Sequence, residues 1–496
     1  MANETKRKRS PIVRIGIDLD QIIVTEDGIE TPEGFAEWVP AQREKERELL
    51  LFGVFGDEIV ADLEGLGFFK SSDDGGLGFS KDDLHLAGDD AAKHKAIRGK
   101  RLSHYIAGDL EIFESRHFTR RAQPILFSYM ISDDHPTFAD WPSVDNYLGW
   151  SVGVRKLSKN QLRKISPIKE YGDNFIYHLN TMADEPFILK RYYEKDTGDH
   201  DRLKVEVKNL KNLSDAGLAT VPTPMWNDGA EWVVFNYVEG KDVTDAGDKD
   251  VELLSQFLID LDNTGEKLKK RRIAPAFDAR LTLKDYVKGI KTLWDLVFNS
   301  VQRGGLTDVT MFMMTDLEQM RQDNINHFYL WCKREKWDQE AELPKKERIF
   351  NPGDFGFHNA IRRPDGNLVF VDFEYSGWDD PAKLMADFFY NTNQNLDMDK
   401  KLKVLDAFVQ HRDWDKNFLN RFWAVCDLVA VEWIVRRLLV CVPAEQHRLM
   451  LADPNVNIPK LIEERLAEAQ ELRNNYKPME HLCKHAQLLE DESELK

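Results

Sequence analysis

The chain has 496 residues and a net charge of −18, with 42% apolar and 31% charged residues. A chain of this length is expected to form two or three globular domains. Its acidic balance disfavours a nucleic-acid-binding protein, and the lack of an 18-residue apolar run disfavours a membrane span. The four cysteines have no C-x2-C spacing, which argues against a zinc site and for a reducing compartment. We find no signal-peptide pattern and therefore expect a cytoplasmic protein.

The two ends of the chain are charged and lack apolar periodicity. Residues 1–11 include the basic patch Lys6–Arg9, which is too short to indicate nucleic-acid binding. Residues 485–496 include the acidic run Glu490–Glu494. We expect a disordered basic tail and a solvated acidic tail.

The first 150 residues alternate between apolar strand-like segments and helix-like segments, which predicts a parallel α/β sheet. The predicted strands are Ile12–Asp20, Leu49–Phe55, His104–Phe113 and Pro124–Phe127. A helix is predicted from Asp57 to Leu66. The first strand delivers Asp18 and Asp20 at alternate positions, and Asp109 lies near the acidic end of the third strand.

An Asp-x-Asp pair after an apolar strand resembles the opening motif of the haloacid dehalogenase-like (HAD-like) phosphohydrolases. The resemblance implies that Asp18 attacks phosphorus, that Asp20 acts as acid and base, and that Mg²⁺ is held by Asp18 and a later acidic residue. Asp109 resembles the late acidic motif of that superfamily.

This domain departs from the HAD-like pattern in three places. Ile22 stands where Thr or Val is usual, Gly108 stands where Asp is usual, and no Ser or Thr ends Leu49–Phe55. The lysine of the third motif is Lys95 or Lys100, and the sequence does not decide between them. A phosphohydrolase and a degenerate domain that docks on or regulates the rest of the chain are therefore equal alternatives.

A turn-rich segment begins at Asp133–Pro142 and extends through Trp150, and we place the domain boundary at residue 150. Ile168–Leu179 then predicts a hairpin whose turn contains Gly172 and Asn174.

Two strands and a helix are predicted downstream of this hairpin. Glu185–Tyr192 is a strand with Lys190 near its end, and Glu231–Gly240 is a second strand. Between them, Arg202–Leu213 has the apolar spacing of an amphipathic helix, and Glu206 lies beside its apolar face. A surface lysine and a solvated helix carboxylate explain Lys190 and Glu206 equally well when each is considered alone.

The remaining chain is mostly helical by its apolar spacing. The predicted helices are Leu253–Leu268, Leu283–Val301, Thr315–Lys336, Lys383–Gln394, Lys401–His411, Asn417–Val442 and Ile458–Tyr476. Trp294, Trp331, Trp414, Trp423 and Trp433 lie among them. Tryptophan faces bind quaternary ammonium groups, but tryptophans at helical spacing are more often core residues.

The segment Asn351–Asn359, followed by Val369–Glu374, carries the strongest chemical signal. Asp354 precedes Asn359 by five positions, and Asp372 ends an apolar strand behind a Pro-Asp-Gly turn. This pattern fits phosphoryl transfer, in which Asp354 accepts the proton of the attacking hydroxyl while Asn359 and Asp372 bind Mg²⁺ through oxygen. An Asp/Asn-rich loop explains any one of these residues, but the combination favours chemistry.

Gly353–Ile361 and Val369–Phe389 resemble the aminoglycoside phosphotransferase/choline kinase family, whose members share the protein-kinase-like fold. The resemblance covers about residues 160–450. It departs at Asn351 and Pro352, where many members carry a histidine that supports the loop. It implies ATP and Mg²⁺ as cofactors and the hydroxyl group of a small molecule as acceptor.

The resemblance also implies an ATP-binding lobe over residues 151–240 and a helical lobe over residues 241–484. Lys190 would pair with the α/β-phosphates and Glu206 would hold Lys190, as in kinases. The hairpin with Gly172 and Asn174 would cover the phosphates. The adenine would bond to the backbone at about Phe235 to Tyr237.

Asp379 and Asp380 lie near the acceptor site that the resemblance implies. They would bind a cationic or sugar substrate, or cap the helix that starts near Ala382.

The expected fold is therefore α/β plus α+β: a Rossmann-like HAD-type domain over residues 12–150, then a bilobal protein-kinase-like domain. The expected function is ATP- and Mg²⁺-dependent phosphorylation of a hydroxyl on a sugar, an amino alcohol or an aminoglycoside-like molecule. The alternatives are a pseudokinase-like binding protein and a phosphohydrolase that acts through the N-terminal domain.

Overall fold

The computed structural model describes residues 13–25, 28–119, 121–128, 135–158, 160–169, 174–192, 200–394, 396–413, 415–452 and 455–479. The chain divides into two compact units. The first consists of Met1–Ile168, Ile176–Arg191 and Met225–Phe235, and the second of Lys169–Phe175, Tyr192–Pro224 and Asn236–Lys496. Both predicted terminal tails lie outside the described residues.

The first unit contains a six-stranded sheet of order β5-β4-β1-β6-β7-β8, in which every pair of neighbours is parallel. Its strands are β1 (Val13–Asp18), β4 (Arg47–Gly53), β5 (Leu84–Leu86), β6 (His104–Ala107), β7 (Gln123–Phe127) and β8 (Thr137–Phe138). The expected parallel sheet is confirmed. The chain direction across the sheet reverses between β1 and β6, and open α/β sheets bind ligands at the carboxyl ends of strands beside such a point.

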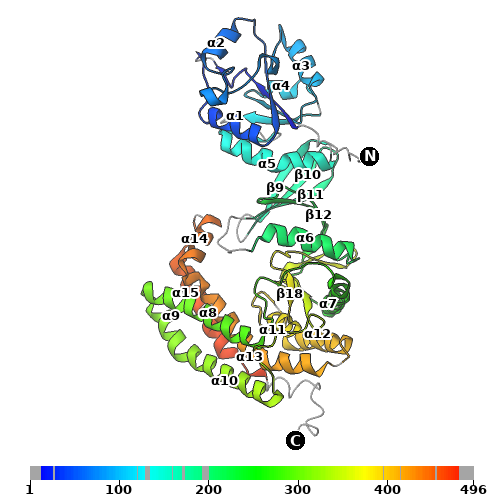
Figure 1. The fold of residues 1–496 in the computed structure, drawn as a ribbon, viewed down its shortest axis with the longest axis vertical. Coiled ribbons are helices and arrows are strands. Elements are labelled where there is room, and N and C mark those ends of the chain that lie inside the picture. Colours follow the sequence, from blue (N-terminus) through cyan, green and yellow to red (C-terminus); the bar gives the residue numbers. More distant parts are fainter. Residues whose placement is uncertain are drawn as a thin grey trace, which may run out of the picture. The chain divides into compact units, whose positions relative to one another are not determined.

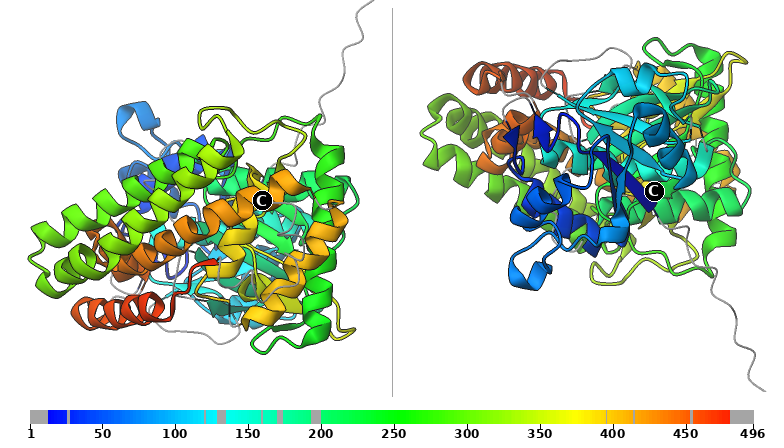
Figure 2. Two further views of the ribbon diagram at one scale, coloured as in Figure 1. Left: turned by 90° about the horizontal axis from the view of Figure 1, so that it is seen from below. Right: turned by 90° about the horizontal axis from the view of Figure 1, so that it is seen from above.

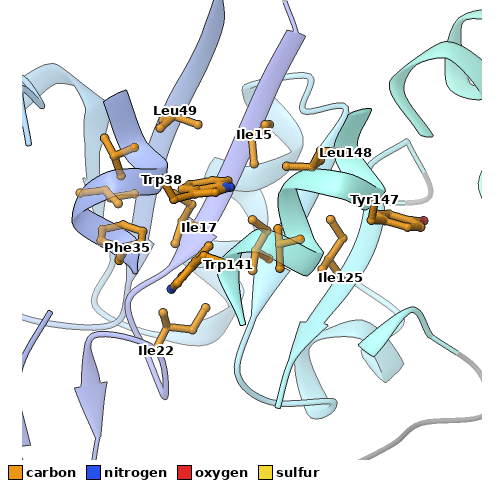
Figure 3. Packing of buried hydrophobic residues seen from close by; sticks show 14 of the residues in the cluster. Ile15, Ile17, Ile22, Phe35, Trp38, Leu49, Ile125, Trp141, Tyr147 and Leu148 are labelled. Carbon is orange, nitrogen blue, oxygen red and sulfur yellow. The ribbon is translucent and has the colours of Figure 1, made fainter. Parts of the chain in front are cut away.

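Helices cover both faces of this sheet (Figure 1). The helices are α1 (Phe35–Glu44), α2 (Ile59–Gly65), α3 (Asp90–Gly99), α4 (Glu111–Glu114) and α5 (Trp141–Ser158), with short helices η1 (Ser72–Asp74) and η2 (Lys81–Asp83) and a small hairpin of β2 (Val24–Thr25) and β3 (Gly28–Ile29). Alternate strand residues face opposite sides. Ile15 and Ile17 pack with Trp38 and Trp141 (Figure 3), while Tyr105 belongs to the core on the other face.

The segment around residue 150 is helical, where we expected turns. Helix α5 spans Trp141–Ser158 and therefore crosses the predicted boundary. Its Pro142 lies in the first turn, where proline removes no helical hydrogen bond. Its apolar residues Val144 and Leu148 are four positions apart and both are buried. The turn-forming residues of Asp133–Pro142 therefore lie before the helix or within its first turn, and do not continue beyond it.

A five-stranded sheet of order β12-β13-β11-β10-β9 falls mostly in the first unit. Its strands are β9 (Leu162–Lys169), β10 (Asn174–Thr181), β11 (Pro186–Tyr192), β12 (Pro224–Asn227) and β13 (Trp232–Asn236). The buried cluster of β1 and α5 continues into this sheet through Leu179, Leu189 and Val234. One apolar core therefore joins the six-stranded sheet, α5 and the five-stranded sheet.

The predicted strand His104–Phe113 is wrong in its second half. Strand β6 ends at Ala107, and α4 begins at Glu111. The apolar residues Ile112 and Phe113 are buried from a helix instead of from the sheet.

The second unit is mainly helical. Its helices are α6 (Arg202–Asp215), α7 (Asp248–Leu268), α8 (Leu283–Arg303), α9 (Thr307–Phe312), the π-helical turn η3 (Met313–Leu317), α10 (Glu318–Glu335), η4 (Phe357–Asn359), α11 (Pro381–Tyr390), α12 (Met398–His411), α13 (Lys416–Arg437), η5 (Leu438–Cys441), α14 (Pro443–Ala452) and α15 (Ile458–Asn475). Helix α13 lies against α8, α10 and α11 (Figure 2). None of the helices in the described part of the chain is long and apolar enough to cross a membrane.

Two small sheets complete the second unit. Strands β14 (Lys241–Asp242), β16 (Ala360–Arg362) and β17 (Leu368–Phe370) form one, and β15 (Ile349–Asn351) pairs with β18 (Gly377–Asp379) in the other. Trp294 and Trp423 are buried, as expected of core tryptophans, and Trp331 and Trp433 are half-buried. Trp414 lies outside the described residues.

Candidate active site

The hairpin of β16 and β17 brings the two predicted halves of the site together. The strands pair antiparallel with Ala360 opposite Phe370, as the Pro-Asp-Gly turn predicted. Beyond the last pair, the N–H of Val371 donates to the main-chain oxygen of Asn359 over 2.9 Å. Asp372 therefore follows directly after a residue that is hydrogen-bonded to Asn359.

Asp354 is half-buried and connected to this hairpin through Asn359. The side-chain amide nitrogen of Asn359 donates to the main-chain oxygen of Asp354 over 2.8 Å. Because the nitrogen makes this bond, the amide oxygen is available to a cation. The Asp354 carboxylate has two neighbours that the sequence did not indicate: Asn391 donates to Oδ1 over 2.7 Å, and Nε2 of His358 lies 2.9 Å from the same atom.

Gly353 allows the Asp354 loop to approach the chain after Asp372. Its φ of +102° falls in the region that favours glycine. A Cβ atom at this position would lie 2.7 Å from Cβ of Tyr375, closer than non-bonded carbons tolerate. The loop that carries Asp354 therefore approaches the segment after Asp372 at Gly353 and Tyr375.

Asn351 supports the loop that carries Asp354. Its Oδ1 accepts the N–H of Gly353 over 2.9 Å, and its Nδ2 donates to Oδ2 of Asp379 over 2.9 Å. Burial raises the pKa of Asp379 to about 6, although Lys383 and the N–H donors around the carboxylate oppose the shift. The Asn351 amide therefore connects Gly353 with Asp379 and holds the loop.

Asp372 has a strained backbone. Its φ is +69°, and left-handed backbone costs a residue with a side chain roughly 1–2 kcal/mol. Such strain persists where the surrounding structure fixes it and is typical of functional sites. The carboxylate oxygens of Asp372, Glu206 and Glu374 lie within 4.8 Å of one another. Carboxylate oxygens are the hard ligands that Mg²⁺ prefers, and of these three side chains Asp372 is the one that is not fully buried.

The two glutamates of this group already accept hydrogen bonds at both oxygens. Glu374 accepts from Arg202 and Asn174, each over 2.7 Å. Glu206 accepts from the N–H of Phe373 over 3.0 Å and from the hydroxyl of Tyr192. Both glutamates are buried.

The remaining kinase-type candidates are distributed over both units. Lys190 in β11 and Phe235 in β13 are buried in the first unit, and Asn174 and Tyr237 belong to the second. The chain passes from the first unit to the second after Phe235. Gly172 lies outside the described residues. The pairing of Lys190 with Glu206 stays a prediction.

The Asp379–Asp380 pair is buried. Asp380 caps α11 by accepting the N–H of Ala382 over 2.9 Å, and it also accepts from Arg421 over 2.8 Å. Of the two expectations for this pair, the structure contains the helix cap.

Asp18 and Asp20 lie at the carboxyl end of β1, and both contact Lys93. Nζ of Lys93 is 3.0 Å from Oδ2 of Asp18 and 2.6 Å from Oδ2 of Asp20. The hydroxyl of Tyr105 donates to Oδ2 of Asp18 over 3.0 Å. Burial raises the pKa of Asp18 to about 7, and the Lys93 ammonium opposes this rise.

The lysine at this site is Lys93, and our expectation of Lys95 or Lys100 was wrong. Lys93 shares the buried face of α3 with Ile97, four residues later, whereas Lys95 is exposed. The spacing from Ile97 was the available signal. Asp109 is also exposed, and its Oδ1 accepts the N–H of Glu111 over 2.9 Å. Within the described residues, no metal-like cluster of acidic, His or Cys side chains includes Asp18, Asp20 or Asp109.

Comparison with known proteins finds one matching family. Residues 164–415, which are 252 of the 496 residues, match the phosphotransferase enzyme family. No curated protein gives a significant match.

Solved structures with a related chain path include three kinases of low identity. Spectinomycin phosphotransferase APH(9)-Ia, in complex with ADP and spectinomycin, is 8% identical (65% of this chain, 97% of that chain, TM-score 0.43). Ethanolamine kinase from Plasmodium vivax is 14% identical (68% and 92%, TM-score 0.41). Choline kinase LicA from Streptococcus pneumoniae is 15% identical (67% and 100%, TM-score 0.40). At these TM-scores the likenesses carry no argument about the site.

Proposed function

We propose that this chain, which belongs to the phosphotransferase enzyme family and is a small-molecule kinase, transfers the terminal phosphoryl group of ATP to a hydroxyl group in a Mg²⁺-dependent reaction. The observation that carries the proposal is the position of Asn359. Its side-chain nitrogen donates to the main-chain oxygen of Asp354, and its main-chain oxygen accepts from Val371, the residue before Asp372.

Asp354 is the proposed catalytic base. A base must lie within hydrogen-bond reach of the hydroxyl that it deprotonates, and its carboxylate must be held in one orientation. Asn391 supplies that orientation by donating from Nδ2 to Oδ1 of Asp354, and Nε2 of His358 contacts the same oxygen. The carboxylate would align the acceptor hydroxyl and take its proton as the phosphoryl group is transferred.

Asp372 and Asn359 are the proposed Mg²⁺ ligands. Bound Mg²⁺ would neutralise charge on the phosphate oxygens. The strained backbone of Asp372 and the fixed amide of Asn359 would hold their oxygens ready before the nucleotide binds, so that little reorganisation is needed during transfer.

The proposed nucleotide contacts are those that the resemblance to the aminoglycoside phosphotransferase/choline kinase family implies. Lys190 would bind the α/β-phosphates and be held by Glu206, the hairpin with Gly172 and Asn174 would cover the phosphates, and the backbone from Phe235 to Tyr237 would bond to adenine. The acceptor would be a sugar, an amino alcohol or an aminoglycoside-like molecule.

Turnover of ATP over a panel of such acceptors tests this proposal. Asp354→Asn should lower kcat by roughly 10²- to 10⁴-fold, the usual contribution of a general base, and Asp372→Asn should abolish Mg²⁺-dependent turnover. Asp399→Asn on the exposed face of α12 is the matched control and should behave as wild type. Unchanged turnover in the two site variants would reject the assignment. Failure of wild type to bind Mg-ATP would instead favour a pseudokinase-like protein.

A second candidate function is phosphate hydrolysis by the N-terminal domain. The observation that favours it is the contact of Lys93 with both aspartates at the carboxyl end of β1. Asp18→Asn in the full chain should remove any phosphatase activity while leaving ATP-dependent transfer intact. A phosphatase activity that survives this substitution would exclude the site.

A further inference from the structure

One face of helix α6 is polar and yet buried. Arg202, Glu206 and Asn209 follow one another at spacings of four and three residues, so they share a face. They are 4%, 1% and 4% exposed. Burying an arginine, a glutamate and an asparagine is unfavourable unless each finds hydrogen-bond partners. We call these three residues the polar stripe of α6.

The polar stripe bonds to the four residues that follow Asp372. Arg202 donates to Oε1 of Glu374 over 2.7 Å and lies 3.2 Å from the hydroxyl of Tyr375. Glu206 accepts the N–H of Phe373, and Asn209 donates to the main-chain oxygen and the Oγ of Ser376 over 3.1 Å and 3.0 Å. Each residue of the stripe thus contacts a different point of one short segment.

These contacts bear directly on the backbone of Asp372. The N–H of Phe373 belongs to the peptide group that follows Asp372, so its bond to Glu206 fixes the orientation of that peptide plane. A backbone with φ of +69° needs such support, because a strained conformation persists only where its surroundings determine it. The salt bridge of Arg202 with Glu374 anchors the chain two residues after Asp372.

The arrangement also separates the roles of the two acidic residues. Both oxygens of Glu374 are bonded to nitrogen donors, and its side chain and that of Arg202 are only 2% and 4% exposed. A carboxylate committed to a buried guanidinium is a structural partner, and its charge is already neutralised.

We propose that Arg202 and Asn209 are positioning residues, which hold the Asp372 carboxylate at the metal site through residues 373–376, and that Glu374 receives Arg202 and is not a metal ligand. This inference rests on the proposed function, since it takes Asp372 as the Mg²⁺ ligand. Helix α6 would then have two roles: its polar stripe would position Asp372, and Glu206 would also hold Lys190.

The test compares Arg202→Met, Arg202→Lys, Glu374→Gln and the double variant Arg202→Met/Glu374→Gln in the full chain. Two quantities are measured: the Mg²⁺ concentration for half-maximal ADP binding, by calorimetry, and KM against kcat for ATP. We expect Arg202→Met and Glu374→Gln each to raise that Mg²⁺ concentration about tenfold. Arg202→Lys should recover part of the loss. The double variant should be no worse than either single variant, because both remove one interaction.

Folding is controlled separately, because Arg202→Met leaves a buried carboxylate without its cation. The double variant removes both charges and avoids that problem. Asn209→Ala removes the bonds to Ser376 without leaving a buried charge, and it should raise the required Mg²⁺ concentration severalfold while lowering stability, because buried hydrogen bonds are lost. Lys204→Met on the exposed side of the same helix, whose side chain is 72% exposed, should match wild type in every measurement.

The outcomes separate the two proposals. One outcome is that Glu374→Gln loses far more Mg²⁺ affinity than Arg202→Met, and that the loss in the double variant equals the sum of the two single losses. Glu374 would then be a metal ligand, and the inference would be overturned. Wild-type transfer with no shift in any α6 variant would overturn the inference and leave the proposed function standing. If the α6 variants shifted Mg²⁺-dependent ADP binding as expected but wild type transferred no phosphoryl group, the proposed function would be overturned and the inference would stand. No Mg²⁺-dependent binding by wild type would overturn both.

Discussion

Asn391 donates a 2.7 Å hydrogen bond to Oδ1 of Asp354, although 37 residues separate them in the chain. The amide of Asn391 is itself fixed, because its Oδ1 accepts the N–H of Asn393 over 2.9 Å. A rigid amide that bonds to a half-buried carboxylate restricts that carboxylate to one orientation. The site therefore includes a residue from the loop after α11 as well as the hairpin of β16 and β17.

Replacing Asn391 with Ala should lower kcat by about 10- to 100-fold, since a hydrogen bond to a charged group contributes roughly 1.5–3 kcal/mol. KM for ATP should change little, because Asn391 contacts the proposed base and not the proposed nucleotide ligands. Steady-state kinetics measure both. Asn393→Ala is the control, since Asn393 is exposed and donates through its main chain. Equal kcat in both variants would contradict the role of Asn391.

The left-handed backbone of Asp372 predicts an unusual order of stabilities. Asp372→Gly should be more stable than Asp372→Ala by about 1 kcal/mol, because glycine adopts positive φ without steric penalty. Both variants should be inactive. Urea unfolding measures the difference, and an alanine variant as stable as the glycine variant would show that the backbone at this position is not strained.

The proposed catalytic and metal-binding residues were easier to predict from the sequence than the residues that hold them in position. Asp354, Asn359 and Asp372 stand close together in sequence, and turn chemistry at Pro364–Gly366 indicates how the chain folds back. Asn391 and the polar stripe of α6 act across the fold, and nothing in local composition distinguishes a buried polar helix face from a solvated one. Only the partners on another element decide that, and a single sequence does not contain them.

Gly153 in α5 offers a test of the joined core of the first unit. A Cβ at Gly153 would lie 2.1 Å from the ring of Trp226, so Gly153→Ala should destabilise the protein by roughly 1–3 kcal/mol through overpacking. Gly149→Ala in the same helix meets no atom within 4 Å and should stabilise it by roughly 0.5–1 kcal/mol. Thermal or urea unfolding gives both values. Two alanines of equal effect would mean that α5 does not pack on Trp226.

Lys401 predicts a pH dependence of stability. It is 9% exposed, donates to the main-chain oxygen of Phe389 over 2.6 Å, and has a pKa that burial lowers to about 8, against weak opposition from Asp397. Between about pH 8 and the ordinary lysine pKa near 10.4, the unfolded chain holds the proton that the folded chain has lost. Stability should therefore rise with pH across this window as the charge penalty is relieved.

Lys401→Met should remove that rise, while Lys403→Met, on the exposed side of the same helix, should keep it. The free energy of unfolding at pH 7.5 and pH 9.5 measures the slope in each variant. The same slope in Lys401→Met as in wild type would show that other groups cause it.

The first unit was harder to predict than the second, again because partners on other elements decide which residues are buried. The alternation of strands and helices predicted its parallel sheet, but α5 was not predicted because the turn-forming residues of Asp133–Pro142 lie directly before and within its first turn. Lys93 was missed because a lysine on a helix is usually solvated, and its burial depends on two carboxylates from a strand far away in sequence.

The apolar cluster that runs from β1 through α5 to Val234 has a practical consequence for dissection of this enzyme. A fragment that starts at residue 160 would keep every residue of the family match at 164–415. It would lack α5, however, and would expose to solvent the apolar residues of the five-stranded sheet that pack with α5. Such a fragment is expected to precipitate, so inactivity after truncation would report lost solubility and say nothing about regulation.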